Sequence, residues 1–389
     1  MSGFGGMTPA ERLEHVPAIE DLSRLAKRRM PHFAWEYLDS GTGFEAAIRR
    51  NRDCLDQVLF KPRGLQGEIR PELSTELFGR KYDLPFGMAP VGMTGLMWPG
   101  AELMLARSAR RTNIPYCLST VACETPEDVG RTAGENGWFQ LYTFAEWAIN
   151  EDLLKRAGDS GFSVLVITVD LPAPSMRERQ RRAGLRVPPK ITPQFIANVL
   201  ARPAWALATR KRGKPAFRML EKYLGGEDMR DLPKFLADQQ VGTLYRWKDL
   251  ARFRKLWKGP IVIKGLLDTE DARCAVEEGM DGIVVSNHGG RQFDGAPASI
   301  SVLPEIAETV GGKTAIVFDS GVRTGLDVLR ALALGADFVL AGRPYLYGAA
   351  AHGEAGADHV SHILATDLAN NMVQLGVSRL SQLRGLAVA

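Results

Sequence analysis

The sequence alternates, from about residue 85 to its end, between short apolar runs and longer segments with helical spacing. Most of these runs are apolar throughout, which is typical of parallel strands that are buried on both faces. Eight runs fit this pattern. We therefore predict strands at 85–92, 115–120, 138–142, 163–170, 260–265, 282–289, 314–321 and 338–343.

Helix signals lie between the predicted strands. Thr125 stands before a proline and two acidic residues, and Asp268 opens a similar segment that ends near Gly279; both are typical N-cap residues. Residues 325–334 have helical apolar spacing and end at Gly335. Eight strands that alternate with helices predict an α/β fold, the (β/α)8 TIM barrel. An open doubly wound sheet is the alternative, but it usually carries a GxGxxG turn after a strand, and no such turn is found here.

Two segments lie outside the strand count. Residues 1–84 precede the first strand, and we predict an N-terminal helical cap over the barrel mouth. Residues 85–389 then form the barrel, and they include an insertion at 171–250 after the fourth strand. This insertion is far longer than an ordinary loop and helix. Long loops after barrel strands lie on the catalytic face.

The composition is that of an ordinary soluble globular protein. The chain has 389 residues, of which 45% are hydrophobic and 24% are charged, which excludes disordered and fibrous classes. No apolar run reaches the ~18 residues that span a bilayer, and residues 1–29 lack the apolar core of a secretory signal. The four cysteines have no CxxC spacing, so we expect reduced thiols, two of them in the core, and no metal site.

Positive charge is concentrated in the insertion. Between residues 177 and 222 there are thirteen Lys or Arg and two Glu, a formal charge of +11, against −7 for the rest of the chain. We predict a cytoplasmic protein that docks on the anionic inner face of the cell membrane through 177–222. A solvated flexible loop is the alternative, and nucleic acid is not favoured because no nucleic-acid module accompanies the charge. The apolar residues expected to enter the membrane interface are Phe195, Ile196, Val199, Leu200, Trp205 and Leu207.

Polar residues gather where the predicted strands end. One such residue is an ordinary helix cap, but polar tips on seven strands of one barrel point to a site, because catalysis belongs to the C-terminal ends of barrel strands. These residues are Ser119, Gln140, Tyr142, Thr168, Asp170, Lys264, Ser286, His288, Arg291, Asp319, Gly321, Arg323, Gly342 and Arg343.

The ends of the seventh and eighth strands predict a phosphate cradle. Gly321 and Gly342 let the backbone approach an anion, and Arg323 and Arg343 add positive charge. The helix that begins near Thr324 directs its N–H groups at the same place. Solvated arginines on ordinary turns are the alternative.

His288 is the candidate base. A lone histidine is more often a packed or surface residue, but His288 follows a strand and has glycines after it, and Asp170 can orient its ring. Lys264 is the only charge in its strand and requires an anionic partner. Arg177 and Arg291 can form a fork for a carboxylate, because guanidinium geometry matches it bidentately.

Several motifs together resemble a known family. The phrases APVG, LST, WFQLY, TVD, IVIKGLLD, SNHGGRQ, DSGVR and GRP are similar to those of the FMN-dependent α-hydroxy-acid dehydrogenases and oxidases, from about residue 30 to the C-terminus. The lactate dehydrogenase branch, which is bacterial and respiratory, and the mandelate dehydrogenase branch are the most similar. The resemblance implies FMN at the strand ends and a homotetramer.

The resemblance also assigns roles. His288 would be the active-site base, Arg177 and Arg291 would bind the substrate carboxylate, and Tyr37 and Tyr142 would contact substrate. The base would take a proton from the hydroxyl if hydride moves to the flavin, or from Cα if a carbanion forms. The residues that would hold FMN are Pro90, Val91, Gly92, Ser119, Gln140, Thr168, Lys264, Ser286, Asp319, Gly321, Arg323, Gly342 and Arg343.

The implied reaction is oxidation of an L-2-hydroxy acid, first of all L-lactate, to the 2-oxo acid. Gly92 stands where oxidases of the family tend to carry alanine, which favours a dehydrogenase that passes electrons to a membrane quinone or cytochrome. An H2O2-producing oxidase and a non-catalytic flavin-binding barrel are alternatives. Val121 and Phe144 favour a pocket that also admits aromatic acids such as mandelate. Trp35 and Leu38 replace tyrosines of the family pattern around Tyr37.

Overall fold

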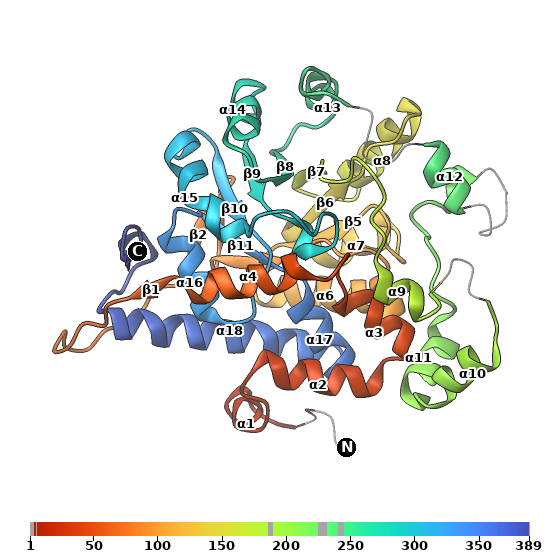
Figure 1. The fold of residues 1–389 in the computed structure, drawn as a ribbon, viewed down its shortest axis with the longest axis horizontal. Helices are drawn as coiled ribbons and strands as arrows, with labels where there is room; N and C mark the ends of the chain where they lie inside the picture. Colours follow the sequence, from red (N-terminus) through yellow and green to blue (C-terminus); the bar gives the residue numbers. More distant parts are fainter. Residues whose placement is uncertain (1–3, 5, 186–189, 225–231, 240–244, 389) are drawn as a thin grey trace.

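A closed barrel of eight parallel strands forms the centre of the protein (Figure 1). The computed structural model describes residue 4 and residues 6–185, 190–224, 232–239 and 245–388. The barrel confirms the predicted (β/α)8 fold, and each predicted strand overlaps one of its strands. These are β4 (Phe86–Met88), β5 (Tyr116–Ser119), β6 (Gly137–Leu141), β7 (Val164–Thr168), β8 (Ile261–Leu266), β9 (Gly282–Val285), β10 (Ala315–Phe318) and β11 (Phe338–Ala341).

The strand register brings the predicted polar tips to one end of the barrel. Ser119 of β5 pairs with Gln140 of β6, and Thr168 of β7 pairs with Lys264 of β8. All neighbouring strands run in parallel, so the loops that follow them lie at the same mouth. Several strands are shorter than predicted, because the last residues of the predicted runs belong to these loops.

Helices surround the barrel and begin where the capping signals predict. The Oγ1 atom of Thr125 accepts a hydrogen bond from the backbone N–H of Asp128, and Asp268 caps its helix in the same way. Thr324 forms a capping box with Asp327. The surrounding helices are α5 (Thr94–Met97), α6 (Ala101–Arg111), α7 (Pro126–Ala133), α8 (Trp147–Asp159), α13 (Leu250–Leu256), α14 (Thr269–Glu277), α15 (Ser299–Val310), α16 (Gly325–Ala333), α17 (Arg343–His352) and α18 (Glu354–Leu375).

A β-hairpin closes the end of the barrel opposite the polar mouth. The hairpin consists of β2 (Thr75–Leu77) and β3 (Arg80–Tyr82). Its apolar side chains join a buried cluster with Trp138 and Phe338, which lie at the start of their strands. Trp138 Nε1 donates a hydrogen bond to Tyr82 Oη at 3.2 Å. The barrel interior is therefore packed at this end.

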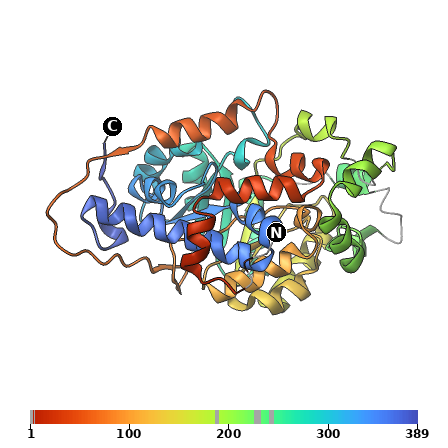
Figure 2. The same cartoon turned by 90° about the horizontal axis from the view of Figure 1, so that it is seen from below.

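The N-terminal segment is only partly helical. Its helices are α1 (Pro9–His15), α2 (Ile19–Arg29), α3 (His32–Asp39) and α4 (Ala46–Asp56), and α2 packs against α17. The predicted all-helical cap missed the hairpin and also β1 (Leu59–Phe60), which pairs with β12 (Ala387–Val388) near the C-terminus. The hairpin strands are short and largely polar, and β1 and β12 have two residues each, so a two-residue period cannot reveal them. A long extended stretch follows β1 (Figure 2).

The insertion lies on the side of the molecule away from the C-terminus (Figures 1 and 2). Its helices are α9 (Glu178–Arg182), α10 (Pro193–Leu200), α11 (Pro203–Arg212) and α12 (Leu232–Asp238). The prediction that Trp205 enters a membrane interface is wrong, and Phe195 is only half-exposed. Trp205 is 4% exposed and donates to the carbonyl of Leu96, and the Phe195 ring stacks on Phe33.

Part of the insertion's positive charge is neutralised by ion pairs with carboxylates of the same chain. Arg179 forms ion pairs with three carboxylates of the N-terminal segment, and Arg212 and Arg218 both pair with Glu124. Lys222 pairs with Asp152 in the same manner. Arg186 lies outside the described residues. Within the described residues no helix has the length and apolar character needed to cross a membrane.

Candidate active site

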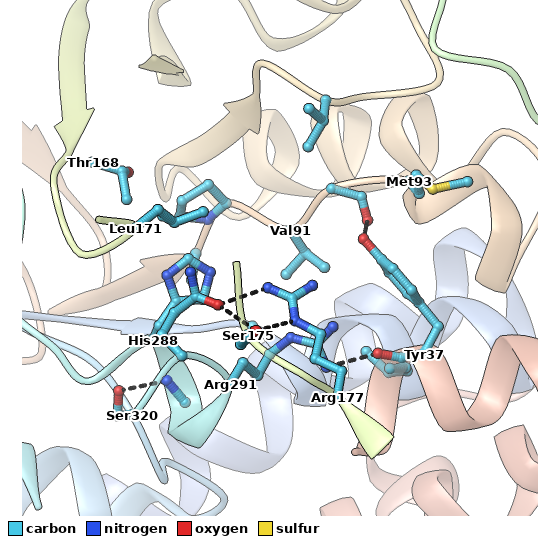
Figure 3. A pocket seen from close by; sticks show the side chains of 18 of the residues that line it. Tyr37, Val91, Met93, Thr168, Leu171, Ser175, Arg177, His288, Arg291 and Ser320 are labelled. Atoms are coloured by element: carbon cyan, nitrogen blue, oxygen red, sulfur yellow. Dashed lines mark hydrogen bonds between the residues drawn. The ribbon is translucent and has the colours of Figure 1, made fainter. Parts of the chain in front are cut away.

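A cavity of about 850 Å³ opens at the C-terminal ends of the strands (Figure 3). This volume is near the upper end of the range of small-molecule sites, about 300–1,000 Å³. Most of the predicted site residues line it, and they come from the N-terminal segment, the insertion and the loops of the barrel strands. They are Tyr37, Pro90, Val91, Gly92, Tyr142, Thr168, Arg177, Lys264, His288, Arg291, Asp319, Gly321, Arg323, Gly342 and Arg343.

Four predicted site residues lie behind the cavity wall. Ser119 donates a hydrogen bond to Gln140 Oε1 at 3.0 Å, and both side chains are buried. Ser286 accepts hydrogen bonds from Lys264 Nζ and from the backbone N–H of His288. These residues therefore support the wall, and the fourth one, Asp170, supports the base.

His288 and Asp170 form a hydrogen-bonded pair. His288 Nδ1 lies 2.9 Å from Asp170 Oδ1. Gly265 makes room for this arrangement, since a Cβ atom there would lie 2.6 Å from Cγ of Asp170. Because an ionised carboxylate only accepts hydrogen bonds, Nδ1 carries a hydrogen and Nε2 is left as the basic nitrogen.

The surroundings keep this pair in the state that a base requires. Burial lowers the pKa of His288, and Asp170 opposes that effect while Lys264 adds to it. Burial alone would raise the pKa of Asp170, but the interaction with His288 and the charge of Lys264 hold it below its ordinary value. The resting pair is therefore a neutral imidazole on an ionised carboxylate.

Two guanidinium groups lie side by side near the base (Figure 3). Arg291 Nη1 donates to the backbone carbonyls of Tyr37 and Ser40, each at 2.7 Å. Arg177 is held by neutral oxygens as well, which are Ser175 Oγ and Gln292 Oε1. No carboxylate of the described residues forms an ion pair with either arginine.

The unpaired charges make this part of the cavity an anion site. Burial, together with the positive charge of Arg177, lowers the pKa of Arg291 to about 9. Two neighbouring, partly buried guanidinium groups without a carboxylate repel each other, and an incoming carboxylate relieves that repulsion. This arrangement is the one expected for recognition of an organic acid.

Two tyrosines border the anion site. Tyr37 Oη donates to the backbone carbonyl of Gly92 at 3.2 Å, and its ring lies beneath Arg291. Burial, with a contribution from Asp170, raises the pKa of Tyr142. Tyr142 therefore keeps its phenolic hydrogen and can donate it to an oxygen in the cavity.

Lys264 and Asp319 form a buried ion pair in the cavity floor. Lys264 Nζ lies 2.9 Å from Asp319 Oδ2, and the two side chains are 4% and 9% exposed. Burial alone would lower the pKa of Lys264, but Asp319 and Asp170 raise it above the ordinary value. Lys264 therefore remains a fixed positive charge below any group that occupies the cavity.

Four non-glycine residues at the cavity have a left-handed backbone that side chains rarely adopt. The φ angles are 51° for Met93, 44° for Arg177, 57° for His288 and 89° for Ser320. Such conformations cost about 1–3 kcal/mol each and gather at functional sites. In each case the surrounding hydrogen bonds hold the residue in place, as when Ser320 Oγ accepts from the N–H of Gly289.

The cavity fits a flavin nucleotide on its own features. Thr168 lines the cavity, and its buried Oγ1 atom has no hydrogen-bond partner, as expected where a bound heterocycle supplies the partner. Arg323 and Arg343 border the other part of the cavity, as a phosphate group requires. Arg343 donates three hydrogen bonds to the carbonyls of Leu38, Gly289 and Ser40, so only the remaining N–H groups of its guanidinium can bind a phosphate.

The structure also corrects and extends the predicted pocket. Val121 and Leu38 line the cavity, but Phe144 does not, because it is fully buried against Phe235. Trp35 is buried against Tyr347. Sequence reasoning missed several lining residues, most of which stand outside the family motifs, although Gln292 is the last residue of SNHGGRQ. They are Met93, Leu171, Ser175, Met176, Phe217, Leu236 and Gln292.

The mouth of the barrel brings together a histidine base, an anion-binding pair of arginines and a groove with unpaired polar atoms. This combination is typical of an enzyme that oxidises an organic acid with a bound heterocyclic cofactor. The sequence itself then gives the family. The profile of FMN-dependent dehydrogenases matches residues 26–389, and the chain belongs to this family, whose cofactor is FMN.

The most similar relatives found include bacterial L-lactate dehydrogenases. Those of Alcaligenes faecalis and Pseudomonas aeruginosa are each 39% identical, over 95% of this chain and 97% of theirs. Among solved structures, the monotopic membrane protein (S)-mandelate dehydrogenase has a TM-score of 0.89 at 34% identity, with 94% of this chain and 97% of that chain covered. A mandelate oxidase has a TM-score of 0.79 at 32% identity, with 94% and 96% covered.

Proposed function

We propose that this protein oxidises an L-2-hydroxy acid to the 2-oxo acid, and that L-lactate is its preferred substrate. The observation that carries the proposal is the unpaired arginine couple beside an oriented histidine in one cavity. A 2-hydroxy acid has a carboxylate for the arginines and an adjacent carbon–hydroxyl group for the base. The relatives named L-lactate dehydrogenase support the small substrate.

The chain's own residues supply binding and proton transfer. Arg177 and Arg291 hold the carboxylate, and the hydroxyl of Tyr142 donates to a substrate oxygen. His288 takes a proton at Nε2, and Asp170 stabilises the imidazolium cation that results. FMN, when bound, would accept the two electrons of the oxidation together with the second hydrogen of the substrate. Lys264 places a fixed positive charge in the cavity floor, where it would stabilise negative charge.

Anaerobic mixing with a panel of acids tests the proposal. We expect L-lactate to bleach the flavin absorption band of the holoenzyme, and D-lactate to leave it unchanged. The 2-hydroxy amide that matches L-lactate serves as a control without a carboxylate. If no 2-hydroxy acid reduces the flavin, the proposed function is wrong.

A mandelate-type substrate is the second candidate. The cavity wall is apolar beyond the arginines, at Val121, Leu171, Met176, Phe217 and Leu236, and solved relatives are named for mandelate. An aromatic ring suits such a wall. The same panel decides between the two, because kcat/KM for (S)-mandelate above that for L-lactate would favour the second candidate.

We also propose that the electrons leave for a membrane quinone or cytochrome and not for oxygen. Gly92 lies at the cavity, where an added Cβ would meet Val121 Cγ2 at 2.5 Å and Tyr37 Oη at 3.5 Å. An alanine here would collide with Val121, so this glycine lets Val121 pack closely against the backbone at the cavity. Peroxide release during turnover in air checks the proposal, and stoichiometric, rapid H2O2 would contradict it.

A membrane electron acceptor requires that the protein reach the membrane, and we propose that it docks on the inner face of the cell membrane. Ile191, Ile196, Leu200 and Leu207 are exposed on the insertion, and exposed basic residues such as Lys211 accompany them. Such a combination binds anionic bilayers. Sedimentation with anionic vesicles tests it: Leu200→Glu should reduce binding, and Leu256→Glu, at an exposed residue outside this patch, should not.

A homotetramer remains part of the proposal, and it rests on the family resemblance alone. Light scattering of the purified holoenzyme measures the mass directly. A value about four times the chain mass of 42.7 kDa would support it, and a monomeric mass would contradict it.

A further inference from the structure

Ser175, Arg177 and Gln292 form a closed ring of hydrogen bonds at the cavity wall. Arg177 Nε donates to Ser175 Oγ at 3.0 Å, and Arg177 Nη2 donates to Gln292 Oε1 at 2.9 Å. Ser175 Oγ closes the ring by donating to Gln292 Oε1, also at 2.9 Å. Figure 3 shows Ser175 beside the guanidinium of Arg177.

This ring determines which edge of the guanidinium faces the cavity. Nε and one hydrogen of Nη2 are used within the ring, which leaves both hydrogens of Nη1 for a ligand. Arg291 uses Nη1 for backbone carbonyls and keeps Nε and Nη2. Each arginine thus presents a fixed, unused set of donors to the cavity.

The ring orients Arg177 without neutralising it. Both acceptors are uncharged, and no carboxylate of the described residues pairs with Arg177. Arg179, two residues further on, provides the contrast, because Glu36, Asp39 and Glu45 surround it. A carboxylate partner would hold Arg177 equally well but would cancel the charge that attracts an acid.

Local structure makes such support necessary. Arg177 has a left-handed backbone with φ of 44°, which costs energy for a residue with a side chain. Its side chain also extends from a loop, where long side chains have many rotamers. Gln292 reaches it from the loop after β9, and Gln292 Oε1 is the shared acceptor of the ring.

We propose that Ser175 and Gln292 are positioning residues that make the site select carboxylates, because they hold Arg177 in one rotamer with its charge unpaired. This inference rests on the proposed function, since it concerns the same substrate carboxylate. It predicts that the loss of either side chain weakens binding of acids and leaves uncharged analogues almost unaffected.

The experiment uses Ser175→Ala and Gln292→Leu, with Ser301→Ala on α15 as a remote control. We expect KM for the acid and the dissociation constant of the 2-oxo acid, followed by the flavin spectrum of the oxidised holoenzyme, to rise together by about tenfold, with a smaller change in kcat. Binding of the corresponding 2-oxo amide should change by less than about twofold. Ser175→Thr, which keeps the hydroxyl, should bind the acid more tightly than Ser175→Ala and nearly as tightly as the wild type.

Gln292→Glu separates orientation from charge. Its carboxylate can accept from Arg177 in the same place, so a loss of acid binding at least as large as in Gln292→Leu would support the role of unpaired charge. Wild-type acid affinity in Ser175→Ala, or equal losses for acid and amide, would overturn the inference. If Gln292 variants do not fold, the Ser175→Ala and Ser175→Thr pair decides alone. Failure of the proposed function is distinct: the wild-type flavin would then not be reduced by any 2-hydroxy acid.

Discussion

The Nδ1 atom of His288 lies 2.9 Å from Oδ1 of Asp170, although 118 positions separate the two residues in the chain. Asp170 follows β7 and His288 follows β9, and β8 lies between these strands in the barrel. Gly265 of β8 leaves the space that the carboxylate occupies. The pair therefore depends on three consecutive strands of the barrel, and its geometry does not rely on a flexible loop alone.

Removal of the base tests its role directly. His288→Gln keeps the size of the side chain but cannot take up a proton, so we expect the rate of flavin reduction by L-lactate to fall by at least about 10²–10⁴-fold. Asp170→Asn should lower the rate by a similar order, because the imidazolium loses its counter-charge. Stopped-flow absorbance measures both. A near wild-type rate in His288→Gln would show that another group is the base.

The pH dependence follows from the pKa of His288. Only the neutral ring accepts a proton, and burial lowers its pKa below the ordinary 6.5. We therefore expect kcat/KM to be constant near pH 7 and to fall as the pH drops through a value below 6.5. Asp170 raises the pKa of His288, so Asp170→Asn should move this acid limb to still lower pH. A limb above pH 6.5 would contradict the prediction.

Arg179 should hold the insertion against the N-terminal segment through its ion pairs, and we call this contact the Arg179 latch. Its guanidinium contacts Glu36 at 2.7 Å, Glu45 at 2.9 Å and Asp39 at 3.0 Å. Arg179→Gln leaves three carboxylates facing one another, so we expect the loop with Arg177 to loosen and KM to rise several-fold.

The control for this latch is Arg182→Gln, which changes an exposed residue of the same short helix. Limited digestion with thermolysin reports on the loop independently of turnover. Faster cleavage near residues 171–185 in the Arg179 variant alone would support the latch. Equal cleavage rates and equal KM values in both variants would exclude it.

The ion pair in the cavity floor predicts a strong effect on stability. Lys264→Met leaves the carboxylate of Asp319 buried without its partner, and breaking such a pair costs roughly 3–5 kcal/mol. We expect urea unfolding of the holoenzyme to shift accordingly. Lys264→Met combined with Asp319→Asn should recover part of the loss, because no unpaired charge remains. No recovery in the double variant would contradict this account.

The sequence was sufficient to predict the barrel and the charged residues at the centre of the cavity. Buried parallel strands are apolar runs, so their positions can be located, and a closed barrel brings all residues that follow them to one mouth. This is why the sequence alone assigns Lys264, His288 and Arg291 to one site. Their roles remain predictions that the variants above test.

Other features depend on pairing that no periodicity encodes. Ser175 and Gln292 meet across a cavity, and nothing in the chain between them signals the contact. Trp205 and Phe195 sit in a basic amphipathic stretch that reads as a membrane surface, yet both pack on the protein's own residues. The hairpin that contains Tyr82 is polar and very short, so its burial follows only from the shape of the barrel end.

That hairpin has a kinetic consequence. Tyr82 and its neighbours close one end of the barrel, so, among the described residues, small molecules reach the flavin only from the opposite end. The 2-oxo acid and a small electron acceptor therefore use the same opening, and the acid must leave before the acceptor binds. Steady-state data with a soluble acceptor should accordingly give parallel lines in double-reciprocal plots, as a ping-pong mechanism does.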